Sequence, residues 1–234
     1  AYEEHRHCWQ VAGHEVVALE SFELDQQIDM FDVVIVIHPN NPSGETFDRQ
    51  RLLNWQQRLQ MRNGWLIVDE AFLDIIPEQS LAPLPCQHGL IILRSLGKFF
   101  GLAGVRVGFV ITHPDLLKKI AEKSGPWPIA TASRWIASQA LADKNWQQQS
   151  RQYLPQHAQR LTELLGQYKL TPSGGCALFQ WVKTAHAASI HHQLAQQGIL
   201  CRLFDRPAAL RFGLPATEQD WLRLETALQK VEQP

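Results

Sequence analysis

The sequence predicts an α/β fold, with a mostly parallel sheet in a large first domain and a smaller α/β domain after it. Through the first half of the 234-residue chain, short apolar runs rich in Val and Ile alternate with helical patterns. Strands buried on both faces of a parallel sheet have this composition, and the alternation is typical of an α/β layer. A hydrophobic content of 45% is sufficient for a sizeable core.

Five apolar runs predict the strands of the first domain, at residues 16–19, 33–37, 65–68, 90–93 and 105–111. A helix is expected after Asp48, a residue suited to capping, and another is expected to begin at Pro114. The first residues, from Ala1 to His5, are polar and helix-like, with neither a cap nor a leading strand. We expect from this that the chain begins inside a domain.

The pattern changes after residues 123–128. Long helices are expected from Thr131 to Tyr168, with Pro155 starting the second of two segments. A smaller unit follows, whose expected elements are a strand at 177–182, a helix at 187–196, strands at 199–203 and 210–212, and a helix at 217–231. The expected division is therefore a large domain at 1–122, connecting helices at 123–165 and a small domain at 166–234.

The charge composition indicates which kinds of partner the chain is not built to bind. The 22 basic and 23 acidic side chains give a formal net charge of -1, so there is no positive electrostatic field to attract nucleic acid or anionic lipid. No apolar run approaches the roughly 18 residues of a membrane helix, and the first residues of the sequence do not have the pattern of a signal peptide. The expected partner is a small molecule, and the expected location is the cytoplasm.

Cysteine and histidine spacing indicates neither a disulfide framework nor a metal site. The four cysteines are widely scattered and are expected to be buried thiols: Cys8, Cys86, Cys176 and Cys201. The neighbouring histidines His191–His192 and His5–His7 lack the spacing of a ligand set. The sequence therefore predicts no metal.

Lys98 is the residue of greatest chemical interest. It follows the apolar run 90–93, in a loop at the carboxyl end of a strand, where ligands bind in open α/β sheets. Ser95 precedes it by three residues and Arg106 follows it by eight, with small residues between. A hydroxyl and a guanidinium suit a phosphate, and an amine can form an imine with an aldehyde cofactor. An ordinary surface lysine beside tight turns is the alternative.

Asp69 and Asn41 also end or follow predicted strands. Asp69 terminates the run 65–68, so its carboxylate is expected to be partly buried and to need a cation. A protonated pyridine nitrogen, a helix cap or a structural arginine would each meet that need. Glu70 points to the opposite face and is expected to be structural. Asn41 lies in the turn 38–44, where it either donates to a ring oxygen or simply forms the turn, and Gly44 permits a positive φ.

Two arginines fall inside strand patterns of the second half. Arg211 is flanked by apolar residues in the stretch 209–213, and Arg202 lies in the preceding strand pattern. A guanidinium in such a place must find an anion, either a substrate carboxylate or phosphate or an internal carboxylate.

These motifs occur in an order that resembles the class I/II aminotransferase superfamily of fold type I. The order is Asn-Asn-Pro-Ser-Gly at 40–44, Asp-Glu-Ala-Phe at 69–72, Ser-Leu-Gly-Lys at 95–98, and Leu-Arg-Phe-Gly-Leu-Pro at 210–215. The resemblance implies a homodimer that uses pyridoxal 5'-phosphate. It assigns the Schiff base to Lys98, the pyridine nitrogen to Asp69, the ring hydroxyl to Asn41, the phosphate to Ser95 and Arg106, and the substrate carboxylate to Arg211.

Within the superfamily, the stretches 125–128 and 198–215 are most similar to the branch of histidinol-phosphate aminotransferase and threonine-phosphate decarboxylase, with the tail more like the decarboxylase. The resemblance implies a phosphorylated amino acid substrate, with Arg202 on its anionic group. Phe72 stands where many aminotransferases carry a Tyr that bonds the ring oxygen. The family's glycine-rich phosphate loop and its stacking aromatic are expected to lie upstream of the stretch that begins near Tyr2. Three functions stay open: a decarboxylase, an aminotransferase and a non-catalytic partial domain.

Overall fold

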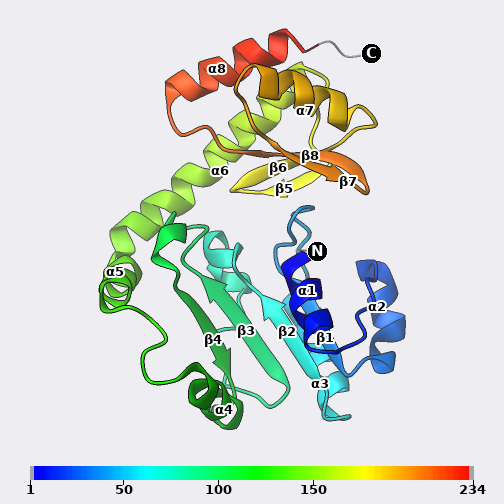
Figure 1. Ribbon diagram of the computed structural model, residues 1–234, viewed down its shortest axis with the longest axis vertical. Helices are drawn as coiled ribbons and strands as arrows, with labels where there is room; N and C mark the ends of the chain where they lie inside the picture. Colours follow the sequence, from blue (N-terminus) through cyan, green and yellow to red (C-terminus); the bar gives the residue numbers. More distant parts are fainter. Residues whose placement is uncertain (1–2, 232–234) are drawn as a thin grey trace. The chain divides into compact units, whose positions relative to one another are not determined.

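The computed structural model describes residues 3–231, which form two compact units (Figure 1). The first unit comprises residues 3–41 and 46–144. The second comprises residues 145–231 together with the short segment 42–45. Each unit has its own buried apolar cluster, so each is described separately.

The first unit is built on a four-stranded sheet in the order β1-β2-β3-β4. Its strands are β1 (Val33–Ile37), β2 (Trp65–Asp69), β3 (Leu90–Ser95) and β4 (Gly108–Thr112). The first three are parallel and β4 is antiparallel, which confirms the mostly parallel sheet. The prediction for the last strand began too early, because residues 103–105 form a 3₁₀ turn, η4 (Ala103–Val105). The predicted strand at 16–19 was wrong: residues 14–20 form neither helix nor strand.

Helices cover the sheet of the first unit (Figure 1). The chain runs through α1 (Glu3–Val11), α2 (Ser21–Gln27), η1 (Ile28–Met30), α3 (Arg49–Gln60), the short turns η2 (Leu73–Ile75) and η3 (Pro77–Gln79), α4 (Pro114–Ser124) and α5 (Thr131–Ala142). Asp48 caps α3 as predicted, since its side chain accepts from the backbone N–H groups of Gln50 and Arg51. Leu52, Trp55 and Leu59 of α3 pack on alternate residues of β1, β2 and β3. This packing fixes one face of the sheet.

The second unit packs helices against an antiparallel sheet in the order β5-β6-β8-β7. Its elements are α6 (Lys144–Gln167), β5 (Gly174–Cys176), β6 (Phe179–Lys183), α7 (Ala187–Gln196), β7 (Arg202–Asp205), β8 (Ala208–Gly213) and α8 (Glu218–Gln229). The predicted α7 is confirmed with its bounds. Pro155 lies inside α6 and does not start a segment; the break between helices falls at Asp143.

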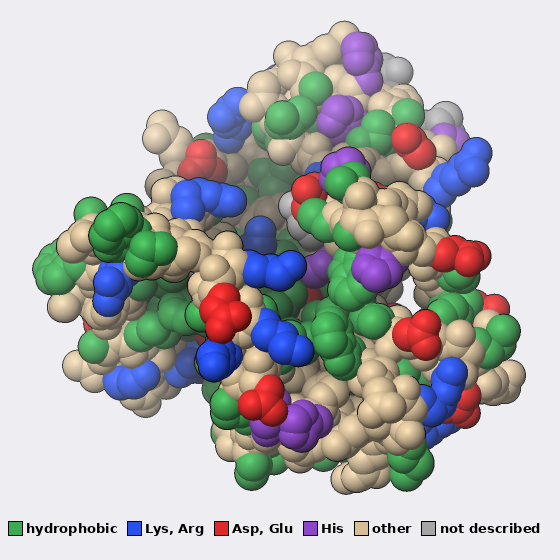
Figure 2. Space-filling view, turned by 60° about the horizontal axis from the view of Figure 1, so that its bottom comes forward, with side chains coloured by type: hydrophobic (Ala, Val, Ile, Leu, Met, Phe, Trp, Pro, Cys, Tyr) green, Lys and Arg blue, Asp and Glu red, His purple; other side chains and the backbone are tan. Residues whose placement is uncertain are grey.

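Basic and acidic side chains are interspersed on the face drawn in Figure 2, in keeping with a net charge near zero. The prediction that all four cysteines are buried was wrong for Cys8 and Cys86, which are exposed, whereas Cys176 is partly buried and Cys201 is buried. Between residues 3 and 231, no helix is both long and apolar enough to cross a membrane.

Candidate active site

The candidate site lies at the carboxyl ends of the parallel strands. The register aligns Ile37 of β1 with Asp69 of β2, and Asp69 with Leu93 of β3. The chain therefore leaves β1 and β2 at one level, whereas β3 continues to Ser95. Backbone hydrogen bonds from His38 N–H to Asp69 O and from Glu70 N–H to Leu93 O continue the pairing beyond β1 and β2. The side chains that the sequence singled out follow these ends, where ligands bind in sheets of this kind.

Asp69 is held at the end of β2 by two hydrogen bonds. One carboxylate oxygen accepts from the backbone N–H of Ala71 at 3.0 Å, and the other lies 2.8 Å from Nε2 of His5 on α1. A carboxylate only accepts, so this ring nitrogen of His5 carries the hydrogen. Both side chains are mostly buried, with 15% and 22% exposed. Each oxygen keeps a second lone pair, which leaves Asp69 able to accept from a further cationic donor.

His5 was missed by the sequence analysis, which considered it only as a metal ligand. It lies far from Asp69 along the chain, and the contact depends on where α1 packs. A histidine on a helix with no metal partner is too weak a signal to identify such a pairing.

Glu70 is structural, as predicted. Its side chain is fully buried, and it accepts from the Ser80 hydroxyl at 2.5 Å, from the Leu81 N–H at 2.8 Å and from Arg94 at 3.1 Å. Arg94 also forms an ion pair with Asp74. The network ties the segment that follows Asp69 to β3 and so restrains the backbone on which Asp69 stands.

Lys98 follows β3 in a tight loop that also carries Ser95 and Arg106. Its side chain is exposed, and its Nζ lies 5.4 Å from the centre of the Phe72 ring. The backbone N–H of Gly97 donates to the Ser95 hydroxyl at 3.1 Å, which fixes the start of the loop. Arg106 has a left-handed backbone conformation, with φ 57°, and its guanidinium is exposed. Two cations and a hydroxyl are therefore carried by one short segment, which suits an anion.

Asn41 is 8% exposed and follows β1 in the turn that begins at His38. His38 is fully buried, and its Nδ1 accepts from the Phe47 N–H at 3.0 Å. Burial lowers the pKa of His38 from 6.5 to about 4. The side chain is therefore neutral at pH 7, and the turn that presents Asn41 is built on an uncharged support.

Residues 42–45 pack within the second unit, against β5. Gly44 has φ 75°, and a Cβ on it would lie 1.8 Å from the carbonyl oxygen of Gly175. The predicted positive φ at Gly44 is confirmed, and the close approach requires glycine as well.

Arg202 and Arg211 lie in the second unit, directly opposite each other on β7 and β8. Opposite residues of an antiparallel pair project from the same face of the sheet. Arg211 is half-buried and Arg202 is exposed. Burial, and then the neighbouring charge of Arg202, lower the pKa of Arg211. Two positive charges on the same face of the sheet favour the binding of an anion between or beside them.

The residues of the first unit have the chemistry that pyridoxal phosphate requires. Asp69 is a mostly buried carboxylate with spare acceptor capacity, Lys98 supplies an exposed amine, and Arg106 supplies a guanidinium. The group therefore fits this donor set. The phosphate loop and the stacking aromatic are expected upstream of Tyr2, which itself lies outside the described residues.

Comparison with known proteins gives one family. The model of the family described as "Aminotransferase class I and II" matches residues 2–232. A threonine-phosphate decarboxylase of Pseudomonas aeruginosa is 47% identical over 233 residues, which is 100% of this chain and 70% of that protein. A histidinol-phosphate aminotransferase of Baumannia cicadellinicola is 35% identical over 149 residues, 60% of this chain and 41% of that protein.

Solved structures confirm the fold. The histidinol-phosphate aminotransferase of Sinorhizobium meliloti, solved in complex with pyridoxal-5'-phosphate, superposes with a TM-score of 0.85 at 22% identity over 98% of this chain and 67% of that one. The likeness to this structure supports the α/β architecture of fold type I. Together with the match over residues 2–232, it shows that the chain belongs to the class I and II aminotransferases, a family of enzymes that depend on pyridoxal phosphate.

Proposed function

We propose that this chain belongs to a pyridoxal-phosphate-dependent lyase that decarboxylates L-threonine O-3-phosphate to (R)-1-aminopropan-2-yl phosphate, a step of cobalamin biosynthesis. The observation that carries the proposal is the 47% identity to a threonine-phosphate decarboxylase along the whole chain. The histidinol-phosphate aminotransferase of Baumannia cicadellinicola is less similar, at 35% identity over 60% of the chain.

The first unit supplies the groups for the cofactor. Lys98 would hold it covalently and Asp69 would keep a proton on its ring nitrogen, while His5 orients the Asp69 carboxylate at 2.8 Å. Asn41 would donate to the ring hydroxyl, and Ser95 and Arg106 would bind the phosphate. When bound, the cofactor accepts the electron pair released as a bond to the substrate Cα breaks.

The second unit supplies cations for the substrate. In this proposal Arg211 binds the carboxylate of the amino acid and Arg202 binds its phosphate. Their opposition across β7 and β8 supports this role, because a substrate with two anionic groups relieves the repulsion between the two guanidinium groups.

Orientation of the substrate decides the reaction. With pyridoxal phosphate bound, the residues that orient the substrate would decide which bond to Cα is broken. In the lyase, Lys98 would deliver the proton that replaces the departing CO₂. In an aminotransferase, Lys98 would instead take the proton from Cα.

Phe72 bears on this choice. Its side chain has no hydrogen-bond donor, so it cannot bond the ring oxygen as a tyrosine would. Its ring lies 5.4 Å from Lys98 Nζ and gives the amine an apolar neighbour.

Aminotransfer by a histidinol-phosphate-type enzyme is the second candidate function, favoured by the relative of that name, and a non-catalytic domain is the third.

A single set of assays separates the three functions. The purified chain is mixed with pyridoxal phosphate, reduced with borohydride and digested, and the modified residue is found by mass spectrometry. We expect pyridoxal phosphate to modify Lys98 in the wild-type chain and in Lys118→Ala. This modification should be lost in Lys98→Ala. CO₂ release from threonine phosphate, without amino transfer to 2-oxoglutarate, then supports the lyase. Amino transfer from histidinol phosphate without CO₂ release would replace the lyase assignment with that of an aminotransferase. A folded chain with no modification at Lys98 would favour the non-catalytic domain.

The oligomer is part of the same proposal. The family resemblance supports a homodimer, and light scattering of the purified chain should give about twice the mass of one chain. If the chain is a monomer and pyridoxal phosphate still modifies Lys98, the homodimer would be removed from the proposal, and a single subunit would be sufficient to bind the cofactor.

A further inference from the structure

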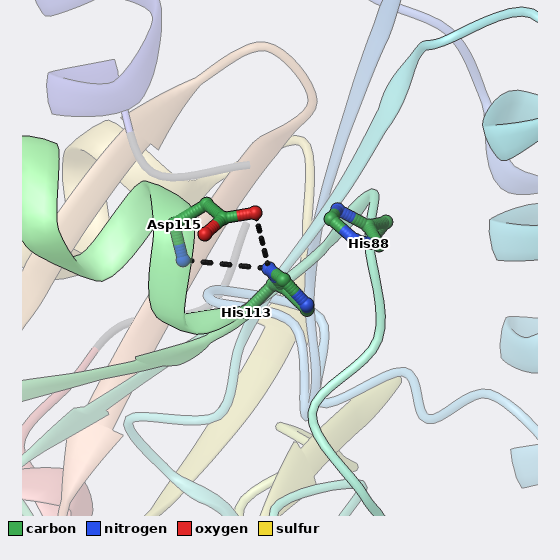
Figure 3. A group of neighbouring side chains, drawn as sticks. All are labelled: His88, His113 and Asp115. Atoms are coloured by element: carbon green, nitrogen blue, oxygen red, sulfur yellow. Dashed lines mark hydrogen bonds and ion pairs between the residues drawn. The ribbon is translucent and has the colours of Figure 1, made fainter.

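We propose that His88, His113 and Asp115 form a binding site for a divalent transition metal ion such as Zn²⁺. One ligand atom from each of the three side chains lies within 4.8 Å of the other two (Figure 3). Two imidazoles and one carboxylate are a donor set that suits Zn²⁺, Ni²⁺ or Cu²⁺ and is poor for Mg²⁺ or Ca²⁺, which prefer several oxygens. The sequence did not predict the site, because the two histidines are far apart in the chain and meet only in the fold.

The backbone under the two histidines is fixed. His113 immediately follows β4, and the register of β3 with β4 pairs Ile91 with Thr112, so the residues beside them lie across from each other. The buried hydroxyl of Thr112 donates to the Leu90 carbonyl at 2.8 Å. On the other side, the fully buried side chain of Gln56 donates to the carbonyl of His88 at 2.9 Å. The histidines are therefore anchored by buried hydrogen bonds while their rings reach the surface.

The side chains already face one another. The rings of His88 and His113 stack with centres 3.5 Å apart, and Nδ1 of His113 lies 3.3 Å from the Asp115 carboxylate. Nδ1 also accepts from the Asp115 backbone N–H, at 3.4 Å, so it carries no hydrogen, and a metal ion bound at Nδ1 would replace this hydrogen bond. A tetrahedral ion with ligands at about 2.0–2.1 Å needs ligand atoms about 3.4 Å apart. The ligand atoms lie up to 4.8 Å apart, so binding would require side-chain rotations, and His88 and Asp115 are exposed to solvent.

The charge of Asp115 and the position of the site at one end of β3 indicate what a bound metal ion would do. Asp115 lies in the first turn of α4 and offsets the positive end of that helix, which would otherwise oppose a cation. The site is at the end of β3 opposite to Ser95, about 20 Å away along a strand that rises about 3.3 Å per residue. A bound ion would join the entry to β3 to the start of α4. It would stabilise the first unit without touching the residues assigned to pyridoxal phosphate.

The test titrates the whole chain with zinc chloride and follows both calorimetric binding and the melting temperature. Wild type should bind one ion and melt at a higher temperature, with little response to magnesium. His88→Asn and His113→Asn should each weaken zinc binding by at least about tenfold. Asparagine at 113 keeps the cap of α4, so the fold is preserved. Binding should also weaken as pH falls, because a protonated ring nitrogen cannot bind a metal ion.

The matched control is His191→Asn/His192→Asn, which removes two neighbouring histidines from α7 and should leave zinc affinity within about twofold of wild type. Modification at Lys98 by pyridoxal phosphate should be the same in all variants, which separates this site from the proposed function. Cobalt absorption adds a check, since a thiolate band would mean that the exposed Cys86, two residues before His88, joins the site. Zinc affinity that is unchanged in both His88→Asn and His113→Asn, or lost equally in the control, overturns the proposal.

Discussion

Charge is stabilised differently in the two units. In the first unit, Asp69 and Glu70 each accept hydrogen bonds from the protein itself, from His5 in one case and from Ser80 and Arg94 in the other. In the second unit, Arg202 and Arg211 face each other as like charges across a strand pair. The first arrangement holds groups in place before any ligand arrives, whereas the second gains from an anionic ligand. We infer that the first unit positions a cofactor and the second binds a substrate.

The comparison makes Asp69 the most sensitive position. Asp69→Asn removes the charge that, under the proposed function, would keep the cofactor's ring nitrogen protonated, and it retains the shape of the side chain. We expect turnover to fall by about 10²–10⁴-fold, with threonine phosphate as the substrate. Steady-state CO₂ release measures it, and Asp32→Asn on the exposed approach to β1 is the matched control. Turnover within a few-fold of wild type would show that Asp69 is only a structural acceptor for His5.

Glu70 tests the supporting network. Glu70→Ala leaves the Arg94 guanidinium partly buried without one of its carboxylates and deprives Leu81 N–H of its acceptor. We expect the free energy of unfolding to fall by about 3–5 kcal/mol, as for other broken buried pairs. Urea denaturation measures it, with Glu78→Ala on η3 as control. A loss below about 1 kcal/mol would mean that the network does not support the segment after Asp69.

Sequence reasoning predicted the parallel strands, the cap at Asp48 and the bounds of α7, because these depend on local patterns. It failed where tertiary contacts decide. The run 16–19 has the composition of a strand but forms none, and Pro155 is accommodated within α6. The bond between His5 and Asp69 and the stack of His88 on His113 join distant segments, so no spacing rule could show them.

His38 gives the turn after β1 a dependence on pH. Burial lowers its pKa to about 4, so between about pH 4 and pH 6.5 the unfolded chain binds a proton that the folded chain does not. The free energy of unfolding should therefore fall as pH is lowered through this range, by at most about 3 kcal/mol from this residue. Denaturation of wild type and His38→Gln at pH 7 and pH 4.5 measures the difference. Equal pH dependence in the two proteins would assign the effect to other groups.

The arginine pair should show opposite effects on function and stability. Arg211→Gln should raise the KM for threonine phosphate by about 10–100-fold through loss of a charge-assisted hydrogen bond. The same change should leave stability equal or raise it by up to about 1 kcal/mol, since like charges no longer face each other. Arg206→Gln, in the turn of the same hairpin, is the control. A lower stability with an unchanged KM would identify Arg211 as a structural residue and break the contrast between the units.

His5 is expected to have the smallest effect, because Asp69 keeps the Ala71 N–H when His5 is removed. His5→Leu should lower the free energy of unfolding by about 1 kcal/mol, the usual worth of one hydrogen bond that is partly exposed. A positioning role predicts more than this stability loss. The absorption of bound pyridoxal phosphate should titrate at a different pH in His5→Leu, because the Asp69 carboxylate is free to turn away from the ring nitrogen. His7→Leu, on the same helix, should leave the titration unchanged. If both variants titrate as wild type does, α1 contributes packing at this edge of the sheet and the first unit orients Asp69 through its own strand alone.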